Sequence, residues 1–213
     1  DWEVSPNNQL IAWAEDSVGR RQYQLFVKDL ATGKTFSDVV ENIAANIVWA
    51  DDNQTLFYIE KDPVTLLSKR VKTHVLGDAN HLDNLVYEEA DDSFYMGISR
   101  TRSEQYICIT VESTVSSEQH FAPANNPVKF TMLAKRERDI EYSADHLNNR
   151  WVIRTNWNAP NYKIMTLGDC ETMGSRTDWR DFIEHKSDVF IEGFELFNLF
   201  IAIEERSNAL LRI

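Results

Sequence analysis

Two carboxylate-rich segments are the first places in this sequence where chemistry could be sought. Glu88-Glu89-Ala90-Asp91-Asp92 could hold a cation, but runs of this kind are usually solvated loops. Asp51-Asp52-Asn53 begins like a calcium-binding loop, yet the glycine and the distal glutamate that such a loop needs do not follow. We therefore expect a solvated loop in the first segment, a turn in the second, and no metal site.

Nucleophiles and bases are not arranged in any familiar catalytic motif. The sequence contains no GxSxG nucleophile elbow, no HExxH zinc motif, no GxxxxGK[ST] phosphate loop and no GxGxxG dinucleotide fingerprint. The histidines lack the i, i+4 spacing of a metal site, and each is expected to be a surface or loop residue: His74, His81, His120, His146 and His185. We expect no catalytic residue and no cofactor in this chain.

The charge balance limits the partners. The 213 residues include 22 basic and 34 acidic side chains, a net charge of −12. This excess of carboxylates repels phosphate, so we expect neither nucleic acid nor membrane as a partner, and a cationic partner instead. No run approaches the roughly 18 apolar residues of a membrane-spanning helix, and Cys108 and Cys170 form no CxxC or Cys/His pattern. A reducing cytoplasm is the expected location.

An internal repeat indicates how the elements are organised. Ser5-Pro6-Asn7-Asn8-Gln9 precedes an apolar run, and Ala50-Asp51-Asp52-Asn53-Gln54 precedes another at an offset of 45 residues. Weaker copies begin near residues 100, 144 and 193. Each unit continues with a polar loop and a second alternating run, such as Tyr23 to Leu30, which predicts strand, turn and strand. A four-stranded unit recurring every 40 to 50 residues is typical of a β-propeller blade.

The predicted fold is therefore all-β, a β-propeller with about four and a half four-stranded blades. The expected blades cover residues 1–40, 45–90, 94–135, 139–180 and 187–213, the last without its outer strands. Only 179–185 is predicted to form a short helical turn. Because the chain has only seven glycines, Asn and Asp must occupy many turns: Asn7, Asn8, Asp52, Asn53, Asn148 and Asn149. The chain starts at Asp1 inside a predicted strand, and we expect it to be part of a longer protein.

Mixed-charge segments fall at one topological position of this predicted fold. In a blade, the loop between the second and third strands emerges on the same face as the connection to the next blade. The segments 14–23, 60–67 and 204–208 are predicted at that position, and each contains both charge signs. Paired charges there can orient a neighbouring domain and break or reform as it moves. The candidate interface or hinge residues are Glu15, Asp16, Arg20, Arg21, Glu204, Glu205 and Arg206.

The loop sequences resemble a known family. The similar stretches keep their order along most of the chain: AEDSVGRRQYQLFVKDLATG (14–33), VWADDNQTLFYIEKDPVTLLSKRVKTHVLGD (48–78), LVYEEADDSFYMGISRTRSEQYI (85–107), IEYSADHLNNRWVIRTN (140–156) and IEGFELFNLFIAIEERSNAL (191–210). They resemble the propeller domain of the oligopeptidase B (protease II) branch of the prolyl oligopeptidase family.

The resemblance implies a serine peptidase that cuts short peptides after Lys or Arg. In that family a seven-bladed propeller caps an α/β-hydrolase domain and excludes folded proteins, and the catalytic Ser, Asp and His belong to the hydrolase domain. Those residues are absent from this sequence, so hydrolysis by this chain alone is not expected. The implied partners are the missing hydrolase domain and short basic peptides, which acidic walls would attract.

Two other functions stay open. One is a non-catalytic interaction module like the WD-repeat propellers, although the GH and WD signatures of those repeats are absent. The other is a propeller enzyme with a sugar or metal site in its central channel. That site would need inward carboxylates or histidines, and the predicted inner strands are too apolar for it: they offer Trp2, Val4, Ile47, Trp49, Tyr95, Ile98, Glu141 and Tyr142.

Overall fold

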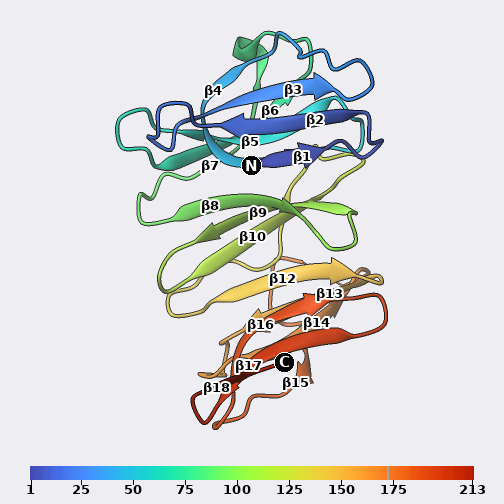
Figure 1. Cartoon of the computed structure of the whole chain (residues 1–213). Helices are drawn as coiled ribbons and strands as arrows, with labels where there is room; N and C mark the ends of the chain where they lie inside the picture. The colour runs from blue at the N-terminus through green and yellow to red at the C-terminus, as the bar shows by residue number, and fades with distance from the viewer. Residues whose placement is uncertain (172) are drawn as a thin grey trace.

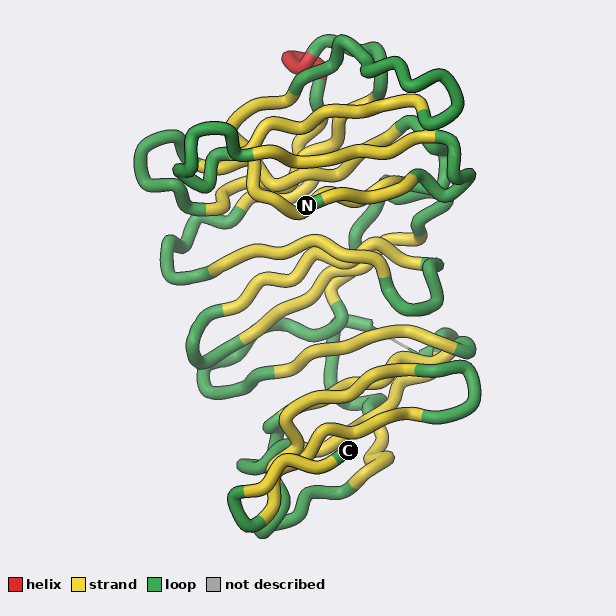
Figure 2. The backbone as a smooth tube through the Cα atoms, in the orientation of Figure 1, coloured by secondary structure: helices red, strands yellow, loops and turns green. Residues whose placement is uncertain are grey.

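Antiparallel strands in a stack of sheets, joined by loops, form the computed structural model, which describes residues 1–171 and 173–213 (Figures 1 and 2). The first sheet contains β1 (Trp2–Val4), β2 (Leu10–Glu15), β3 (Tyr23–Asp29), β4 (Val40–Trp49), β5 (Thr55–Lys61), β6 (Ser68–Val75) and β7 (Asn84–Glu88). The second contains β8 (Tyr95–Arg100), β9 (Tyr106–Glu112), β10 (Ser117–Pro123) and β11 (Thr131–Met132). The third contains β12 (Tyr142–Leu147), β13 (Arg150–Thr155), β14 (Lys163–Gly168) and β15 (Arg180–Ile183), and the last contains β16 (Phe190–Leu196), β17 (Ile201–Ser207) and β18 (Leu210–Arg212).

These sheets form the blades of a β-propeller, as the repeat predicts. In each sheet consecutive strands pair antiparallel, so a blade is a meander that starts at its inner strand. The inner strand β4 lies between β1 and β8, and β12 lies beside β16. The inner strands β1, β8 and β12 follow one another down the front of the molecule in Figure 1.

The predicted boundary between residues 40 and 45 falls inside a single strand. The start of β4 pairs with β3 through Leu25 and Val40, and its end pairs with β5 through Trp49 and Leu56. One strand thus serves as the outer strand of the first repeat and the inner strand of the second, which joins both repeats into one seven-stranded sheet.

The middle strand β9 shows why these runs are almost continuously apolar. Ile107, Ile109 and Val111 belong to the core shared with β4, β5 and β8, whereas Cys108 belongs to the core shared with β12 and β13. Successive strand residues point to opposite faces. In β13, Trp151 and Ile153 face the second sheet and Val152 faces the last. Both faces of these inner sheets are therefore buried, and each sheet needs a neighbour on either side.

Asparagine takes the place of glycine in the turns that repeat. Asn8 and Asn53, 45 residues apart, both have a φ of 59°, and Asn148 and Asn149 also have positive φ. Asn tolerates this left-handed conformation better than other non-glycine residues. Asn7 and Asp52 act differently, because their side chains accept backbone N–H groups of Gln9 and Gln54.

The predicted helical turn at 179–185 is wrong. Arg180–Ile183 forms β15, because this segment pairs with β14 as the outer strand of its blade. Within the described residues the only helix is a 3-10 turn, η1 (Asn80–Leu82). None of the described helical structure is long and apolar enough to cross a membrane.

Tyr142 joins the second and third sheets by hydrogen bonds. Its buried hydroxyl donates to the Ala134 carbonyl oxygen at 2.7 Å and accepts the N–H groups of Gln119 at 2.8 Å and Ala134 at 3.3 Å. The Ser117 hydroxyl adds a bond to the Tyr142 carbonyl oxygen at 2.6 Å. Polar groups buried between the two sheets are thus satisfied by one side chain.

The segment predicted as a solvated carboxylate loop contains a buried ion pair. Glu89 is 4% exposed, and its carboxylate lies 2.8 Å from a guanidinium nitrogen of Arg136, which follows β11 in the next blade. Burial acts to raise the pKa of Glu89, but the Arg136 guanidinium and the Asp91 N–H outweigh it and hold that pKa below its usual value. The expectation of a solvated loop is wrong for Glu89, because sequence alone does not reveal a partner 47 residues away.

Tyr142→Phe is predicted to lower the free energy of unfolding by about 2–4 kcal/mol, because buried N–H groups lose their acceptor. Tyr95→Phe is the control, since Tyr95 is exposed and its hydroxyl has no hydrogen bond to any described residue. Chemical denaturation of both variants measures the difference. Equal effects of the two substitutions would show that the Tyr142 hydroxyl contributes nothing.

Glu89→Gln is predicted to cost about 2–3 kcal/mol at neutral pH, because a charge-assisted bond to Arg136 is lost. The carboxyl has a lowered pKa in the folded state, so its contribution is complete above the unfolded value of about 4.3 and fades as pH falls through the folded value. The stability gap between wild type and variant should therefore shrink below about pH 4.3. Denaturation from pH 7 to pH 3, with Glu112→Gln as an exposed control, tests this, and a gap independent of pH would contradict it.

Candidate functional site

The candidate interface residues of the first blade lie in an ordered loop between β2 and β3. One oxygen of Asp16 accepts the N–H groups of Val18, Gly19 and Arg20, and the other accepts that of Arg21 at 2.7 Å. Desolvation acts to raise the pKa of Asp16, but the four backbone donors together outweigh it and hold that pKa below its ordinary value. Asp16 therefore organises the loop, and Arg20 and Arg21 lie exposed on it.

This loop adjoins the equivalent loop of the second blade. The Lys61 ammonium donates to the Arg21 carbonyl oxygen at 2.7 Å, and the Gln22 amide contacts the Pro63 carbonyl oxygen at 3.5 Å. The two mixed-charge loops are thus neighbours, as the propeller topology predicts. Glu15, at the end of β2, accepts the indole N–H of Trp13 at 3.4 Å.

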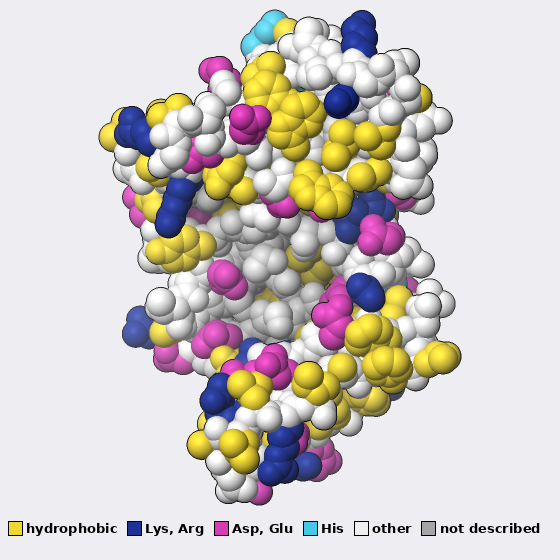
Figure 3. Space-filling model, viewed as in Figure 1, with side chains coloured by type: hydrophobic (Ala, Val, Ile, Leu, Met, Phe, Trp, Pro, Cys, Tyr) yellow, Lys and Arg dark blue, Asp and Glu magenta, His cyan; other side chains and the backbone are white. Residues whose placement is uncertain are grey.

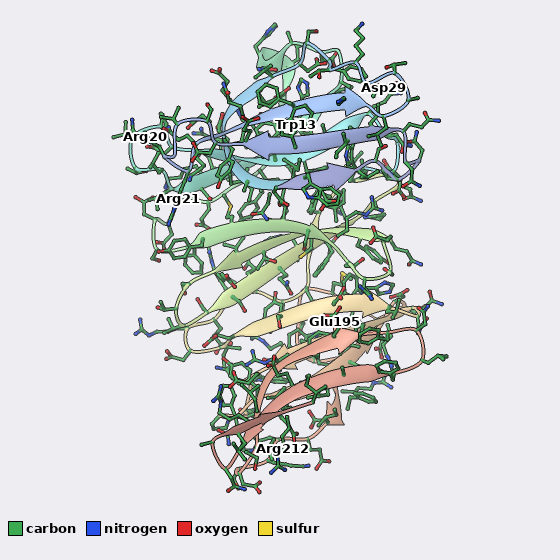
Figure 4. All side chains as sticks on the ribbon, in the orientation of Figure 1. Trp13, Arg20, Arg21, Asp29, Glu195 and Arg212 are labelled. Atoms are coloured by element: carbon green, nitrogen blue, oxygen red, sulfur yellow. The ribbon has the colours of Figure 1, made fainter. Side chains whose placement is uncertain are left out.

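Glu204, Glu205 and Arg206 were expected in a loop, and the structure places them in strand β17. The turn comes later, at Asn208 and Ala209, which both have positive φ. Arg206 pairs with Glu192 of β16 at 2.6 Å. The structure does not bring this group near the first-blade loop: Arg20 and Arg21 lie toward one end of the stack, and Arg212 of β18 lies at the other (Figure 4).

Two of the histidines predicted at the surface or in loops, His74 and His120, lie in strands, the first fully buried and the second mostly buried. His74 of β6 contacts Asp83 through Nδ1 at 2.8 Å, and Tyr58 donates to the other oxygen of Asp83 at 2.8 Å. His120 of β10 is also mostly buried and pairs with Glu118 at 2.8 Å. The surface prediction holds for His81, which is exposed. The strands β6 and β10 are themselves rich in polar residues, so no local signal in the sequence marks His74 and His120 as buried.

His146 forms part of a serine, histidine and aspartate chain. Its Nδ1 lies 2.8 Å from the Ser103 hydroxyl, and its Nε2 lies 2.9 Å from an Asp169 oxygen. Its ring is 0% exposed and packs against both Tyr106 and Trp151. Ser103 belongs to the turn after β8, whereas His146 and Asp169 belong to the next blade. Because the imidazole is fully buried, this chain of bonds is suited to joining two blades rather than to activating a nucleophile.

The inner strands of the second, third and last sheets line a cavity of about 330 Å³. Ser99 lines it from β8, Ser143 and Asp145 from β12, and Gly193 from β16, with Arg154 of β13 behind them. The front face is hollowed around its middle, with acidic side chains at the edges of the hollow (Figure 3). The inner strands are therefore more polar than the sequence predicted, because alternate residues of a strand that also packs a core point to the open side.

A second cavity lies beside the turns after β1, β4 and β8. Arg100 crosses it, with a guanidinium nitrogen 2.7 Å from Asp51 and another 2.8 Å from Glu104. Glu3 also lines this cavity, and burial together with the nearby Glu104 charge raises its pKa. A carboxyl with a raised pKa favours a cationic neighbour, so this cavity suits positive charge.

The charged side chains that line these two cavities can form ion pairs with a charged ligand. In the described part of the chain, no group of three or more His, Cys, Asp or Glu side chains is placed to hold a metal. The geometry of the two cavities supports the binding of a charged ligand. The described residues supply no accessible activated nucleophile.

Comparisons with known proteins agree with the propeller fold. The family described as "Prolyl oligopeptidase, N-terminal beta-propeller domain" matches residues 1–213. The chain is 58% identical to "Dipeptidyl aminopeptidase BI" of Pseudoxanthomonas mexicana over 99% of its length, and 26% identical to "Protease 2" of Moraxella lacunata. The solved structure of oligopeptidase B from Leishmania major superposes on all of this chain with a TM-score of 0.90 at 27% identity.

The chain spans only a part of each of these relatives. It covers 29% of the Pseudoxanthomonas protein, 30% of the Moraxella protein and 30% of the Leishmania chain. The relatives are peptidases in which the propeller is one domain of a longer chain. The sequence motifs, the stacked antiparallel sheets and the family match agree, and this chain belongs to the prolyl oligopeptidase family, through its N-terminal β-propeller domain.

Proposed function

We propose that this chain is the gating and size-filtering portion of a serine peptidase that hydrolyses short peptides after Lys or Arg. The observation that carries the proposal is the superposition of the whole chain on oligopeptidase B at a TM-score of 0.90. In this proposal the propeller admits extended peptides and excludes folded proteins. The chain itself contributes no catalytic triad, which an α/β-hydrolase domain of the parent supplies.

The acidity of the chain supports a basic substrate. The net charge is −12, and Glu3 and Asp145 line the inner cavities as carboxyls whose pKa burial raises. Cationic peptides would be concentrated at such a surface and would meet it faster at low ionic strength. Free thiols at Cys108 and Cys170 support the cytoplasm as the proposed location.

The proposed docking surface for the hydrolase domain is the face that carries the loop between β2 and β3. Asp16 holds that loop in one conformation, so Arg20 and Arg21 are presented without a large ordering cost. Glu15 at the start of the loop and Glu204, Glu205 and Arg206 in the last blade complete the proposed set. Rim charges of this kind set orientation more than affinity.

A second candidate activity is the release of dipeptides from a free amino terminus. The 58% identity to a protein named dipeptidyl aminopeptidase BI favours it. Both candidates need carboxylates that attract a cation, either a basic side chain or a terminal ammonium group. The interaction-module alternative has no comparable support, because the curated relatives cited above carry peptidase names.

The parent peptidase is predicted to cleave an N-terminally blocked arginyl substrate, and kcat/KM should fall several-fold between low and high salt because steering is screened. A neutral substrate of the same length is the control and should respond weakly. Cleavage of only the unblocked substrate, two residues from its amino end, would replace the first candidate with the second. A salt-independent kcat/KM for the arginyl substrate would remove the steering role.

The double substitution Arg20→Gln and Arg21→Gln in the parent is predicted to change kcat/KM by about two- to tenfold with little change in Tm, since exposed charge pairs contribute up to about 1 kcal/mol each. Lys34→Gln is the matched control, because Lys34 is exposed in the connection between β3 and β4 on the opposite face. Steady-state kinetics and thermal melts measure both effects. Identical kinetics for the double variant and wild type would refute the proposed docking role.

A further inference from the structure

The cavity formed by β8, β12 and β16 has a distinctive set of charges. Four charged residues line it: Arg100, Asp145, Arg154 and Glu192. Two of them are already paired, since Arg100 contacts Asp51 and Glu104, and Glu192 contacts Arg206. Within the described part of the chain, Asp145 and Arg154 have no oppositely charged side chain within 4.0 Å.

Among the described residues, Asp145 accepts hydrogen bonds only from backbone donors. One carboxylate oxygen accepts the Arg102 N–H at 2.8 Å and the His146 N–H at 2.7 Å. Burial raises the pKa of Asp145, and these two N–H groups only partly oppose the rise. The nearby Glu195 carboxylate raises it further. A cationic group in the cavity would relieve this cost.

Arg154 is the complementary case. Its Nε donates to the Ile191 carbonyl oxygen at 2.8 Å, and its guanidinium carbon lies 3.5 Å from the centre of the Tyr162 ring. Desolvation by burial lowers its pKa, although Tyr162 and the charges of Glu141 and Glu192 oppose this. The ring and the carbonyl fix the guanidinium plane, and its two terminal nitrogens have no hydrogen bond to any described residue. A guanidinium held in this way is suited to a carboxylate.

Strand register places Asp145 and Arg154 on one face of the ladder. Arg154 lies directly opposite Ser143, and Asp145 is two residues further along β12. Asp145 and Arg154 are therefore diagonal neighbours on one face of the ladder, with backbones about 7–8 Å apart. Two residues of extended peptide span about 7 Å. Gly193, at the cavity wall, adds no side chain, and the Glu204 carboxylate would lie 3.8 Å from a Cβ atom there.

We propose that this cavity binds a small zwitterion, a free dipeptide, whose ammonium group pairs with Asp145 and whose carboxylate pairs with Arg154. A volume of about 330 Å³ is at the small end of the range for ligand sites, which suits a dipeptide. The site needs no hydrolysis, so it is independent of the proposed function. It would allow the propeller to hold short peptides by their two termini.

Calorimetric titration of the 213-residue chain with Ala-Ala, N-acetyl-Ala-Ala and Ala-Ala-amide tests the site. Ala-Ala should bind, and blocking either terminus should weaken binding at least tenfold, because each block removes one charge. Equal affinities for the three peptides, or no binding of Ala-Ala to the folded chain, would overturn the proposal.

Substitutions of Asp145 and Arg154 then show which residue binds which terminus of the dipeptide. Asp145→Asn should abolish the preference for Ala-Ala over N-acetyl-Ala-Ala, and Arg154→Met should abolish the preference over Ala-Ala-amide. Arg150→Met is the matched control, because Arg150 is exposed in the same strand and does not line the cavity. Circular dichroism and Tm establish folding of each variant, and Arg154→Lys replaces Arg154→Met if the latter does not fold. Unchanged preferences in the folded variants would place binding elsewhere and refute the assignment.

Discussion

Packing between successive sheets is the constraint on which the rest of this molecule depends. A single four-stranded sheet with two apolar faces is not stable in water, so each sheet is stabilised only where another covers it. Phe57 and Ile59 of β5 face the second sheet while Leu56 and Tyr58 of the same strand face the first blade. The same alternation in β9 and β13 extends the core through the stack. This packing of each sheet against its neighbours sets the order of the blades and the position of the inner surface.

Polar groups between the sheets fix how the blades are aligned. The Trp49 indole donates to the Glu3 carbonyl oxygen at 3.1 Å, and Arg100 donates to the Trp49 carbonyl oxygen at 3.0 Å. Tyr142 and the Ser103, His146 and Asp169 chain join the second and third sheets. Buried hydrogen bonds have strict geometry, and apolar contacts do not. The hydrophobic core thus holds the sheets together, and these bonds define the alignment that shapes the inner cavities.

The turns and strands, which depend on local periodicity, could be predicted from the sequence. The burial of residues whose partners lie far away in the chain could not. The offset of 45 residues located the turns at Asn8 and Asn53, and the runs identified the strands of each blade. The shared strand β4 was not predicted, because its two ends pair with different neighbours. Glu89 and His146 were expected at the surface, and both are buried by contacts with residues of other blades. Arg154 was not singled out, since nothing local marks a guanidinium that faces a cavity formed by three sheets.

Residue-resolved hydrogen exchange of this chain tests the central claim most directly, because local protection reports the free energy of opening each sheet. If stability comes from neighbours on both faces, the amides of β9 and β13 should exchange slowest. Those of β1 and of β16 to β18, which have fewer covered faces in this chain, should exchange fastest. Equal protection of the last sheet and the middle sheets would contradict the account.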